Sequence, residues 1–304
     1  MTESFYDYIE GRRKRVERLL VKAFTDQRNP TLIATEQMGS LSSACQYATQ
    51  NGGKRIRPIL VWASAHALGL AQESVALDHA ATAIELMHAY SLVHDDLPSM
   101  DDDDLRRGKP SLHVAYNEAT AILVGDGLQA LSFELLSSVP GLEAERALRV
   151  LKILAEAAGV EGMVGGQYID IHATNSGMNL EQLQTMHSLK TGTLIRASLA
   201  MGGVIANASE KQLASLEEYG AQIGLAFQVV DDILDVIGTP KALGKTLGKD
   251  AEADKQTYVT LLGLDGANTE AKRLFESAMD AISDYGESAE HLRELAKYIV
   301  ERDR

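Results

Sequence analysis

Apolar residues recur at helical spacing along almost the whole chain, and this periodicity constrains the fold more than any other feature. Only six of the 304 residues are proline, and no convincing run alternates between apolar and polar residues as a half-buried strand does. Turn-forming pairs such as Asn29-Pro30 and Asn51-Gly52 mark points where the periodicity stops. The sequence therefore predicts an all-α protein.

The helical pattern is interrupted at several points, which divide it into segments. We expect helices over residues 4–24, 36–50, 57–68, 75–95, 113–137, 143–173, 180–206, 210–237, 256–263, 268–285 and 289–302. Residues 238–255 are rich in glycine, lysine and aspartate and are predicted to form a functional loop. Gly166, Gly202 and Gly203 lie within apolar helical pattern, which favours close helix packing there. Because no linker or low-complexity tract interrupts the chain, we expect a single domain over residues 1–304.

Composition and charge exclude several classes of protein. The net charge of −14 argues against a nucleic-acid partner, and any anionic substrate needs a locally basic pocket. Cys45 is the only cysteine, so an intrachain disulfide and a thiolate metal site are excluded. The N-terminus lacks the apolar core of a signal peptide, and no apolar run approaches the ~18 residues that suggest a membrane span. We therefore expect a soluble cytoplasmic protein.

An acidic segment follows the apolar helix that ends near Val93. Six aspartates lie within ten positions, namely Asp95, Asp96, Asp101, Asp102, Asp103 and Asp104. This much negative charge at the end of an apolar helix requires cations or water to compensate it. Mg2+ commonly uses one or two carboxylates together with substrate phosphates, and the arginines at 106 and 107 suit the same phosphates. A solvated acidic loop is the alternative interpretation of this segment alone.

A second acidic cluster favours the metal interpretation. Asp231 and Asp235 are four residues apart on one predicted helix face, and Gln228 lies three residues before Asp231 on the same face. Two carboxylates one turn apart repel each other, so a half-buried helix that carries them needs a counter-ion. An exposed acidic face is the alternative. Two such clusters could hold several Mg2+ ions and a diphosphate between them.

Basic residues occur in three groups. Lys54 and Arg57 follow Gly52-Gly53 at a predicted helix start, which is a natural anion site and otherwise an ordinary basic helix cap. Lys190-Thr191-Gly192 lies inside helical pattern, where the glycine could permit a kink that frees backbone carbonyls. The predicted loop after the second acidic cluster contains the remaining group, Lys245, Lys249 and Lys255.

Two further positions fall on predicted helix faces near these groups. His88 lies seven residues before Asp95, hence on the same helix face as the first acidic segment. Gln167 and Asp170 are three residues apart and are candidates for supporting the site indirectly.

With these residues in view, the chain resembles the trans-isoprenyl diphosphate synthases, and most closely the bacterial farnesyl diphosphate synthases. The resemblance covers nearly the whole chain and rests on motifs in the family's order: Gly53-Lys54-Arg55-Ile56-Arg57-Pro58, Asp95-Asp96-x4-Asp101-x4-Arg106-Arg107-Gly108-Lys109-Pro110, Gly165-Gly166-Gln167-x2-Asp170, Lys190-Thr191 and Gln228-x2-Asp231-Asp232-x2-Asp235. It implies the isoprenoid synthase fold, with helices around a deep central cavity and the aspartate motifs on opposite walls of its mouth. It also implies a homodimer and Mg2+ dependence, with three ions when substrate is bound.

The resemblance assigns roles to individual residues. The metal ligands would be Asp95, Asp96, Asp101, Asp231 and Asp235. The allylic diphosphate would be held by Arg106, Lys190, Lys245 and Lys255. Isopentenyl diphosphate would be held by Lys54, Arg57, His88 and Arg107, with backbone contacts from Gly53. Thr191 and Gln228 would lie beside the reacting carbons, and Tyr90 and Ser91 would form the floor that limits product length.

The implied reaction is the Mg2+-dependent head-to-tail condensation of isopentenyl diphosphate with dimethylallyl and then geranyl diphosphate. The allylic C–O bond breaks towards a carbocation, the isopentenyl double bond attacks it, and the departing diphosphate removes a proton. Tyr90 and the insertion Pro98-Ser99 resemble the bacterial farnesyl pattern. The alternatives are a geranylgeranyl or geranyl diphosphate synthase, a terpene cyclase, and a catalytically silent subunit of a larger synthase. A cyclase would not need Lys54, Arg57 or Arg107, because it binds no second diphosphate.

Overall fold

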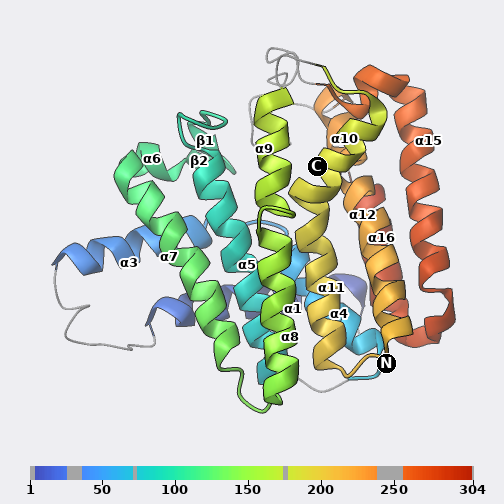
Figure 1. The fold of residues 1–304 in the computed structure, drawn as a ribbon, viewed down its shortest axis with the longest axis horizontal. Helices are drawn as coiled ribbons and strands as arrows, with labels where there is room; N and C mark the ends of the chain where they lie inside the picture. Colours follow the sequence, from blue (N-terminus) through green and yellow to red (C-terminus); the bar gives the residue numbers. More distant parts are fainter. Residues whose placement is uncertain (1–3, 26–35, 71–73, 174–176, 238–255, 303–304) are drawn as a thin grey trace. The chain divides into compact units, whose positions relative to one another are not determined.

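The computed structural model describes residues 4–25, 36–70, 74–173, 177–237 and 256–302. These residues are almost entirely helical, which confirms the predicted all-α class (Figure 1). Their contacts divide the chain into two compact units, Met1–Ile59 with Ser74–Gly141 and Leu60–Glu73 with Leu142–Arg304. We refer to them as the first and second unit. The single domain over residues 1–304 stays a prediction.

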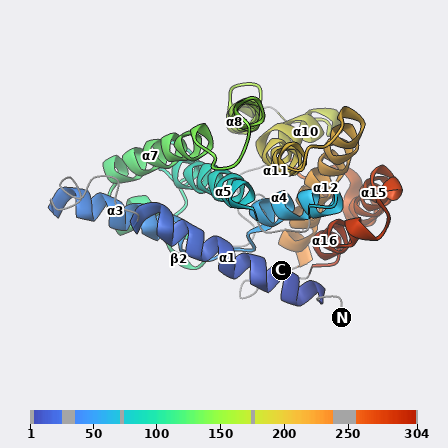
Figure 2. The same cartoon turned by 90° about the horizontal axis from the view of Figure 1, so that it is seen from below.

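The first unit is built around the long buried helix α5. Its elements are α1 (Phe5–Thr25), α3 (Glu36–Thr49), α5 (Val75–Asp95), a hairpin of β1 (Leu105–Arg106) and β2 (Lys109–Pro110), α6 (Leu112–Ala115) and α7 (Glu118–Ser137). Twelve residues of α5 are buried, because its apolar side chains extend round most of the helix. α5 lies between α1 and α7 (Figure 2). Helix α4 (Ile56–Ala67) begins in this unit, and its residues from Leu60 onward belong to the second.

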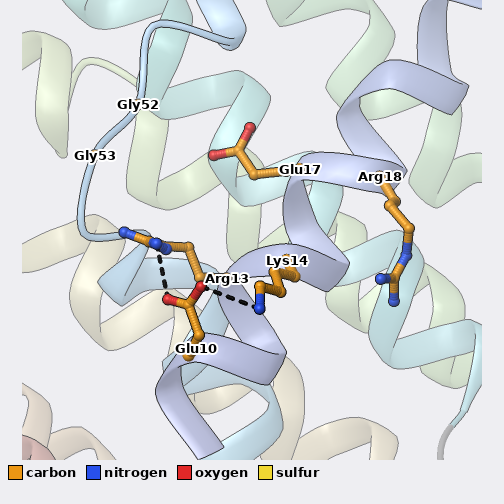
Figure 3. A pocket seen from close by; sticks show the side chains of 7 residues that line it. All are labelled: Glu10, Arg13, Lys14, Glu17, Arg18, Gly52 and Gly53. Carbon is orange, nitrogen blue, oxygen red and sulfur yellow. Dashed lines mark ion pairs between the residues drawn. The ribbon is translucent and has the colours of Figure 1, made fainter. Parts of the chain in front are cut away.

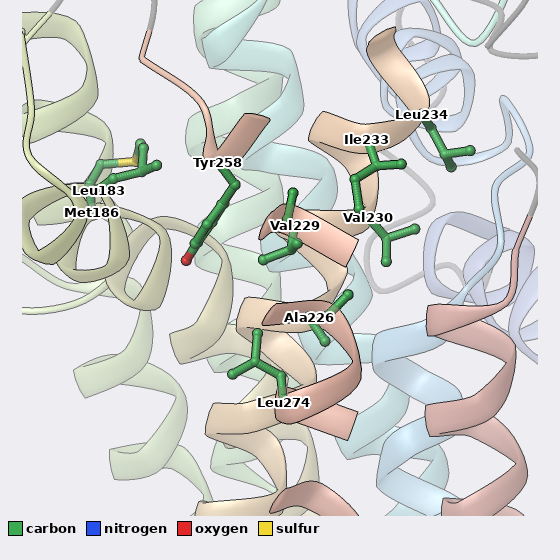
Figure 4. Packing of buried hydrophobic residues seen from close by; sticks show 11 residues of the cluster. Leu183, Met186, Ala226, Val229, Val230, Ile233, Leu234, Tyr258 and Leu274 are labelled. Atoms are coloured by element: carbon green, nitrogen blue, oxygen red, sulfur yellow. The ribbon is translucent and has the colours of Figure 1, made fainter. Parts of the chain in front are cut away.

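The second unit centres on the longest helix, α12. Its further elements are α8 (Ala144–Ala158), α9 (Met163–Ala173), α10 (Leu180–His187), the π-helix η1 (Ser188–Gly192), α11 (Thr193–Ile205), α12 (Glu210–Ile237), α15 (Tyr258–Ala281), the 3-10 helix η2 (Ser283–Ala289) and α16 (Glu290–Val300). α12 packs against α11, α15 and α16. A buried apolar cluster that includes Val229, Ile233 and Leu274 joins α12 to α15 (Figure 4). Side chains between the aspartates of α12 therefore anchor this helix in the core.

Two long helices predicted from periodicity are each broken in the structure. The segment 113–137 forms α6 and α7, because Asn117 accepts a hydrogen bond from the amide of Thr120 at 2.8 Å and starts a new helix. The segment 143–173 forms α8 and α9, separated by the turn that contains Gly159 and Gly162. In both places the apolar spacing continues across the break, so periodicity alone does not reveal it.

Close helix packing explains the three glycines, as predicted. A Cβ on Gly166 would lie 2.1 Å from the backbone nitrogen of Lys190, and one on Gly202 would lie 2.1 Å from the carbonyl oxygen of Val61. A Cβ on Gly203 would approach Leu213 to 2.8 Å.

Among the described residues, one helix, α7, is long and apolar enough to cross a membrane, a test that a core helix of a soluble protein also passes.

Candidate active site

The first acidic segment folds back onto the end of α5. The amide of Asp101 donates to the carbonyl of Asp95 at 2.8 Å, and the amide of Asp103 donates to the carbonyl of Asp96 at 3.2 Å. Asp102 has a φ of 50°, in the left-handed region, where the chain turns sharply. These contacts hold the backbones of Asp95 and Asp101 together, and both residues are partly exposed. Two of the predicted metal ligands thus come from one short turn.

Asp96 has different surroundings from these two aspartates. It is 3% exposed, and its carboxylate accepts hydrogen bonds from Nε of Arg106 at 3.0 and 3.2 Å, with a further contact from Nη2. Burial lowers the pKa of Arg106, but hydrogen bonding to Asp96 and nearby acids, including Asp103, outweigh it and raise that pKa. Asp96 therefore ties the β1–β2 hairpin to the end of α5. Its role as a metal ligand stays a prediction, and a diphosphate at Arg106 would share the guanidinium with this carboxylate.

The glycine loop before α4 packs directly on Arg107. Nη1 of Arg107 donates to Oδ1 of Asn51 at 3.0 Å and also to the carbonyl of Gly52. Gly53 has a φ of 125°, and a Cβ built there would lie 2.6 Å from the guanidinium carbon. Only glycine allows both this conformation and this approach. The backbone of Gly53, which was predicted to contact isopentenyl diphosphate, therefore packs against the guanidinium of Arg107.

An open pocket of about 520 Å³ lies beside this loop and α1 (Figure 3). It is lined by Glu10, Arg13, Lys14, Glu17, Arg18, Gly52 and Gly53. Glu10 forms ion pairs with Arg13 at 2.7 Å and with Lys14 at 3.5 Å. The lining contains three cations and two acids, so its net formal charge is only +1, which is little for a diphosphate.

Arg55, in the same loop, is held by several contacts with other parts of the first unit. It is 3% exposed, has a φ of 54°, and donates to Glu17 at 2.8 Å, Glu85 at 2.5 Å and the carbonyl of Thr49 at 2.6 Å. Burial lowers the pKa of Arg55, but the two acids outweigh burial and raise it. A buried ion pair with several hydrogen bonds fixes the backbone between the glycines and the start of α4.

His88 lies within a field of positive charge. Burial lowers its pKa well below the usual value, and the charges of surrounding arginines lower it further: Arg57, Arg107, Arg55 and Arg106. His88 is therefore a neutral donor and acceptor near neutral pH. The first unit thus gathers His88, Arg57 and Arg107, and Lys54 lies in the adjoining loop. These are the four residues predicted to hold isopentenyl diphosphate.

The residues predicted to limit product length lie one turn before the first acidic segment. The Tyr90 ring stands edge-on to His94 with centroids 5.1 Å apart, and its hydroxyl hydrogen-bonds Gln129 of α7. Burial, followed by the charges of Asp95 and Asp126, raises the pKa of Tyr90. Ser91 donates to the carbonyl of His88 at 2.9 Å, within its own helix. The Tyr90 side chain is therefore held between α5 and α7.

In the second unit, the Lys190-Thr191-Gly192 triplet lies in the π-helix η1, where the sequence indicated a kink. π-Bulges in helices often occur at functional sites. Nζ of Lys190 forms an ion pair with Asp170 at 2.6 Å. Both amide atoms of Gln167 are buried without a hydrogen-bond partner among the described residues. Asp170 thus contacts Lys190, a partner that the spacing of Gln167 and Asp170 did not specify.

A hydrogen-bond chain links η1 to the second acidic cluster. The hydroxyl of Thr191 donates to Oε1 of Gln228 at 2.8 Å, and Nε2 of Gln228 lies 3.4 Å from Oδ2 of Asp231. Oδ1 of Asp231 accepts from Nη2 of Arg302 at 2.7 Å. Thr191, Gln228 and Asp231, which were predicted to lie near the reacting groups, are therefore neighbours in the structure.

The other two aspartates of this cluster differ in burial. Asp232 is 9% exposed and accepts a hydrogen bond from the amide of Tyr258 at 2.7 Å, so it holds the start of α15. Asp235 is partly exposed one turn after Asp231. The predicted diphosphate ligands Lys245 and Lys255 lie outside the described residues.

Comparison with known proteins identifies the family. The model of the polyprenyl synthetase family matches residues 39–299. The chain is 46% identical to the farnesyl diphosphate synthase of Haemophilus influenzae over 86% of this chain and 88% of that protein. The chain belongs to the polyprenyl synthetase family.

Solved structures of synthases agree with this family in sequence and fold. A geranyltransferase from Legionella pneumophila superimposes with a TM-score of 0.85 at 39% identity, covering 98% of this chain and 97% of that one. A geranyltransferase from Helicobacter pylori, solved with magnesium and isoprenyl diphosphate, gives a TM-score of 0.82 at 34% identity and covers 99% and 98%. The isoprenoid synthase fold predicted from the resemblance is confirmed.

The donor chemistry fits the magnesium that this polyprenyl synthetase family implies. Within the described ranges no group of three or more acidic, histidine or cysteine side chains forms a complete metal site. Mg2+ does not need one, because it is usually held by one or two carboxylates, waters and substrate phosphates. Asp95 with Asp101, and Asp231 with Asp235, offer such pairs of partly exposed carboxylates.

Two contacts at this polyprenyl synthetase site were not predicted from the sequence. Arg55 with Glu85, and Arg302 with Asp231, join residues at least 30 positions apart. Glu85 carried a usable signal, since it is the only charged residue between His79 and His88 in an apolar helix. No local pattern indicated Arg302.

Proposed function

We propose that the chain is a farnesyl diphosphate synthase, which condenses isopentenyl diphosphate with dimethylallyl and then geranyl diphosphate. The observation that carries this proposal is the basic group of the first unit, where His88, Arg57 and Arg107 lie beside the Gly52-Gly53 loop. This group is distinct from the acidic turn of Asp95 and Asp101. A terpene cyclase binds one diphosphate and would leave such a group without a ligand.

The basic group binds and orients isopentenyl diphosphate. Arg57 and Arg107 are cations beside a neutral His88, so they can bind phosphate oxygens while His88 donates a hydrogen bond. Lys54 and the backbone of Gly53 complete the set. Isopentenyl diphosphate keeps its diphosphate during the reaction, so the contacts of the basic group with this diphosphate can be strong and need not change at the chemical step.

The diphosphate of the allylic substrate is the leaving group, and a different set of residues binds it. Asp95, Asp101 and Asp231 would hold Mg2+, with Asp96 and Asp235 as further predicted ligands and three ions when substrate is bound. When bound, Mg2+ supplies charge neutralisation to the leaving diphosphate. Arg106, Lys190, Lys245 and Lys255 add hydrogen bonds to the same group.

The second unit stabilises the allylic carbocation. Oε1 of Gln228 accepts a hydrogen bond from the hydroxyl of Thr191, which fixes the amide with its oxygen towards η1. Carbonyl oxygens of this π-helical segment and the Gln228 amide oxygen present partial negative charge to the cation. The isopentenyl double bond then attacks the allylic carbon, and the departed diphosphate accepts the proton that is lost. Tyr90, held by Gln129, limits elongation at fifteen carbons.

We further propose that the protein is a cytoplasmic homodimer. Ile122 and Leu123 on α7 are 45% and 59% exposed and adjacent in the sequence, so they form a small apolar surface. A second copy of the chain would cover them. Size-exclusion chromatography with light scattering tests this, since Leu123→Glu should give a monomer and a monomeric wild type would contradict the dimer.

Release of inorganic pyrophosphate separates a synthase from a cyclase. We expect release from geranyl diphosphate with Mg2+ to be slow alone and to rise strongly when isopentenyl diphosphate is added, with one isopentenyl unit consumed for each pyrophosphate. Fast release from geranyl diphosphate alone, without incorporation, would contradict the proposed function and favour a cyclase.

A further inference from the structure

The residue that contacts Asp231 most closely comes from the C-terminal end of the described chain. Arg302 lies two residues after α16, and its side chain is 2% exposed. α16 buries Leu292, Leu295 and Ile299 and packs on α12, and the carbonyl of Leu292 accepts the Tyr219 hydroxyl at 2.6 Å. The apolar face of α16 thus delivers Arg302 to α12.

Arg302 makes three contacts with one turn of α12. Its Nη2 donates to the carbonyl of Phe227 and to Oδ1 of Asp231, each at 2.7 Å. The guanidinium carbon lies 3.8 Å above the centroid of the Phe227 ring. The planar cation is therefore clamped between the ring and the carboxylate.

These contacts fix one oxygen of Asp231 and leave the other accessible. The Asp231 side chain is 44% exposed, and within the described part of the chain Oδ2 has only the 3.4 Å contact with Nε2 of Gln228. A carboxylate has about four lone-pair sites, so one bond to Arg302 leaves capacity for a cation. The arrangement selects one orientation of a carboxylate that could otherwise rotate freely.

Stability alone does not account for Arg302. Its Nε and Nη1 atoms are buried without hydrogen-bond partners among the residues that the structure describes, which costs free energy. A buried ion pair is often no more stabilising than an apolar residue of similar volume. A methionine or leucine would cover Phe227 without leaving unsatisfied donors. The arginine is therefore explained better by its contact with Asp231.

We propose that Arg302 is a positioning residue, which orients Asp231 through Oδ1 so that Oδ2 faces the divalent cation. This inference rests on the proposed function, because it assigns Asp231 to the metal. Partners that hydrogen-bond a metal-binding carboxylate typically contribute 10- to 100-fold to metal affinity.

Direct metal binding tests this role without measuring turnover. Mn2+ is titrated into the full-length protein with inorganic pyrophosphate present, and free Mn2+ is followed by electron paramagnetic resonance. We expect Arg302→Gln to weaken Mn2+ binding roughly 10- to 100-fold, and Arg302→Lys to recover part of the loss. Arg196→Gln is the matched control, because Arg196 of α11 pairs at 3.0 Å with Glu217 of α12, the helix that carries Asp231, at a point away from the acidic cluster. It should bind Mn2+ as the wild type does.

A double-mutant cycle shows whether the effect passes through Asp231. In the Asp231→Asn background, Arg302→Gln should cause no further loss of Mn2+ affinity. An equal loss in both backgrounds would overturn the inference, and so would unchanged or tighter Mn2+ binding by Arg302→Gln alone. If the wild type itself bound no Mn2+ with pyrophosphate, the proposed function would fail together with the inference. Thermal unfolding of each variant identifies any that are misfolded, and Arg302→Lys then supplies the comparison.

Discussion

Gly53→Ala tests the contact between the glycine loop and Arg107, and Gly52→Ala is its natural control. Both glycines have positive φ, 125° at Gly53 and 85° at Gly52, so alanine strains the backbone at either position. We expect each variant to lose about 1–3 kcal/mol of unfolding free energy. The two glycines differ in what a side chain at each position would meet. A Cβ at Gly52 meets nothing within 4 Å, whereas one at Gly53 would lie 2.6 Å from Cζ and Nη1 of Arg107.

The clash at Gly53 is relieved most easily by moving the guanidinium, because it is the end of a flexible side chain. A charge-assisted hydrogen bond to a phosphate contributes about 1.5–3 kcal/mol, and displacing Arg107 forfeits most of it. Since about 1.4 kcal/mol corresponds to a factor of ten, KM for isopentenyl diphosphate should rise roughly 10- to 100-fold in Gly53→Ala. KM for geranyl diphosphate should change little, and Gly52→Ala should show neither change.

Steady-state kinetics with each substrate varied in turn measures these constants, and chemical denaturation measures the strain. In an Arg107→Ala background, Gly53→Ala should no longer affect KM for isopentenyl diphosphate, because the displaced group is absent. Equal KM values in Gly53→Ala and Gly52→Ala would refute the reasoning. So would a rise in KM that persists without Arg107.

Three further predictions concern the first unit. Glu85→Ala leaves Arg55 buried without its closest partner and should cost about 3–5 kcal/mol of unfolding free energy in urea denaturation. The loss for Glu210→Ala, which breaks an exposed ion pair, should be much smaller, and similar losses would contradict this. His88 has a pKa well below 6.5 in the folded protein, so its contribution to stability is present above pH 6.5 and is lost as the pH falls towards the folded pKa, by up to about 1.36 kcal/mol per pH unit. Denaturation curves at several pH values should show a shallower loss of stability in His88→Gln, and an identical pH profile would count against a neutral imidazole in the folded protein. Tyr90→Ala should lengthen the products beyond fifteen carbons, and an unchanged chain length in a product assay would show that this side chain is not the floor.

Apolar periodicity predicted the bounds of those helices whose ends coincide with the end of the apolar pattern. Helix α5 has the predicted bounds 75–95, and α12 has the predicted 210–237. Periodicity failed at Asn117 and at Gly159, where a break changes the direction of the chain without changing the apolar spacing. The π-turn at Gly192 was indicated only as a kink, because a single extra residue per turn leaves the surrounding pattern nearly intact.

The candidate site was predictable in its residue types and less so in its pairings. Spacing within one helix correctly grouped Gln228 with Asp231. The spacing of Gln167 and Asp170 indicated indirect support of the site but did not identify Lys190 as the partner of Asp170. The partner of Asp96 is Arg106, ten residues later and beyond the acidic turn, and local periodicity does not specify such a contact. Contacts across the fold depend on how helices pack, which one sequence without structure does not define.

The central claim is that this chain elongates an allylic diphosphate and stops at fifteen carbons. The most direct measurement incubates the purified full-length protein with labelled isopentenyl diphosphate, dimethylallyl diphosphate and Mg2+, and resolves the dephosphorylated products by chain length. The account predicts farnesol as the end product. Geranylgeraniol would contradict the role of Tyr90, and no elongation at all would contradict the synthase assignment itself.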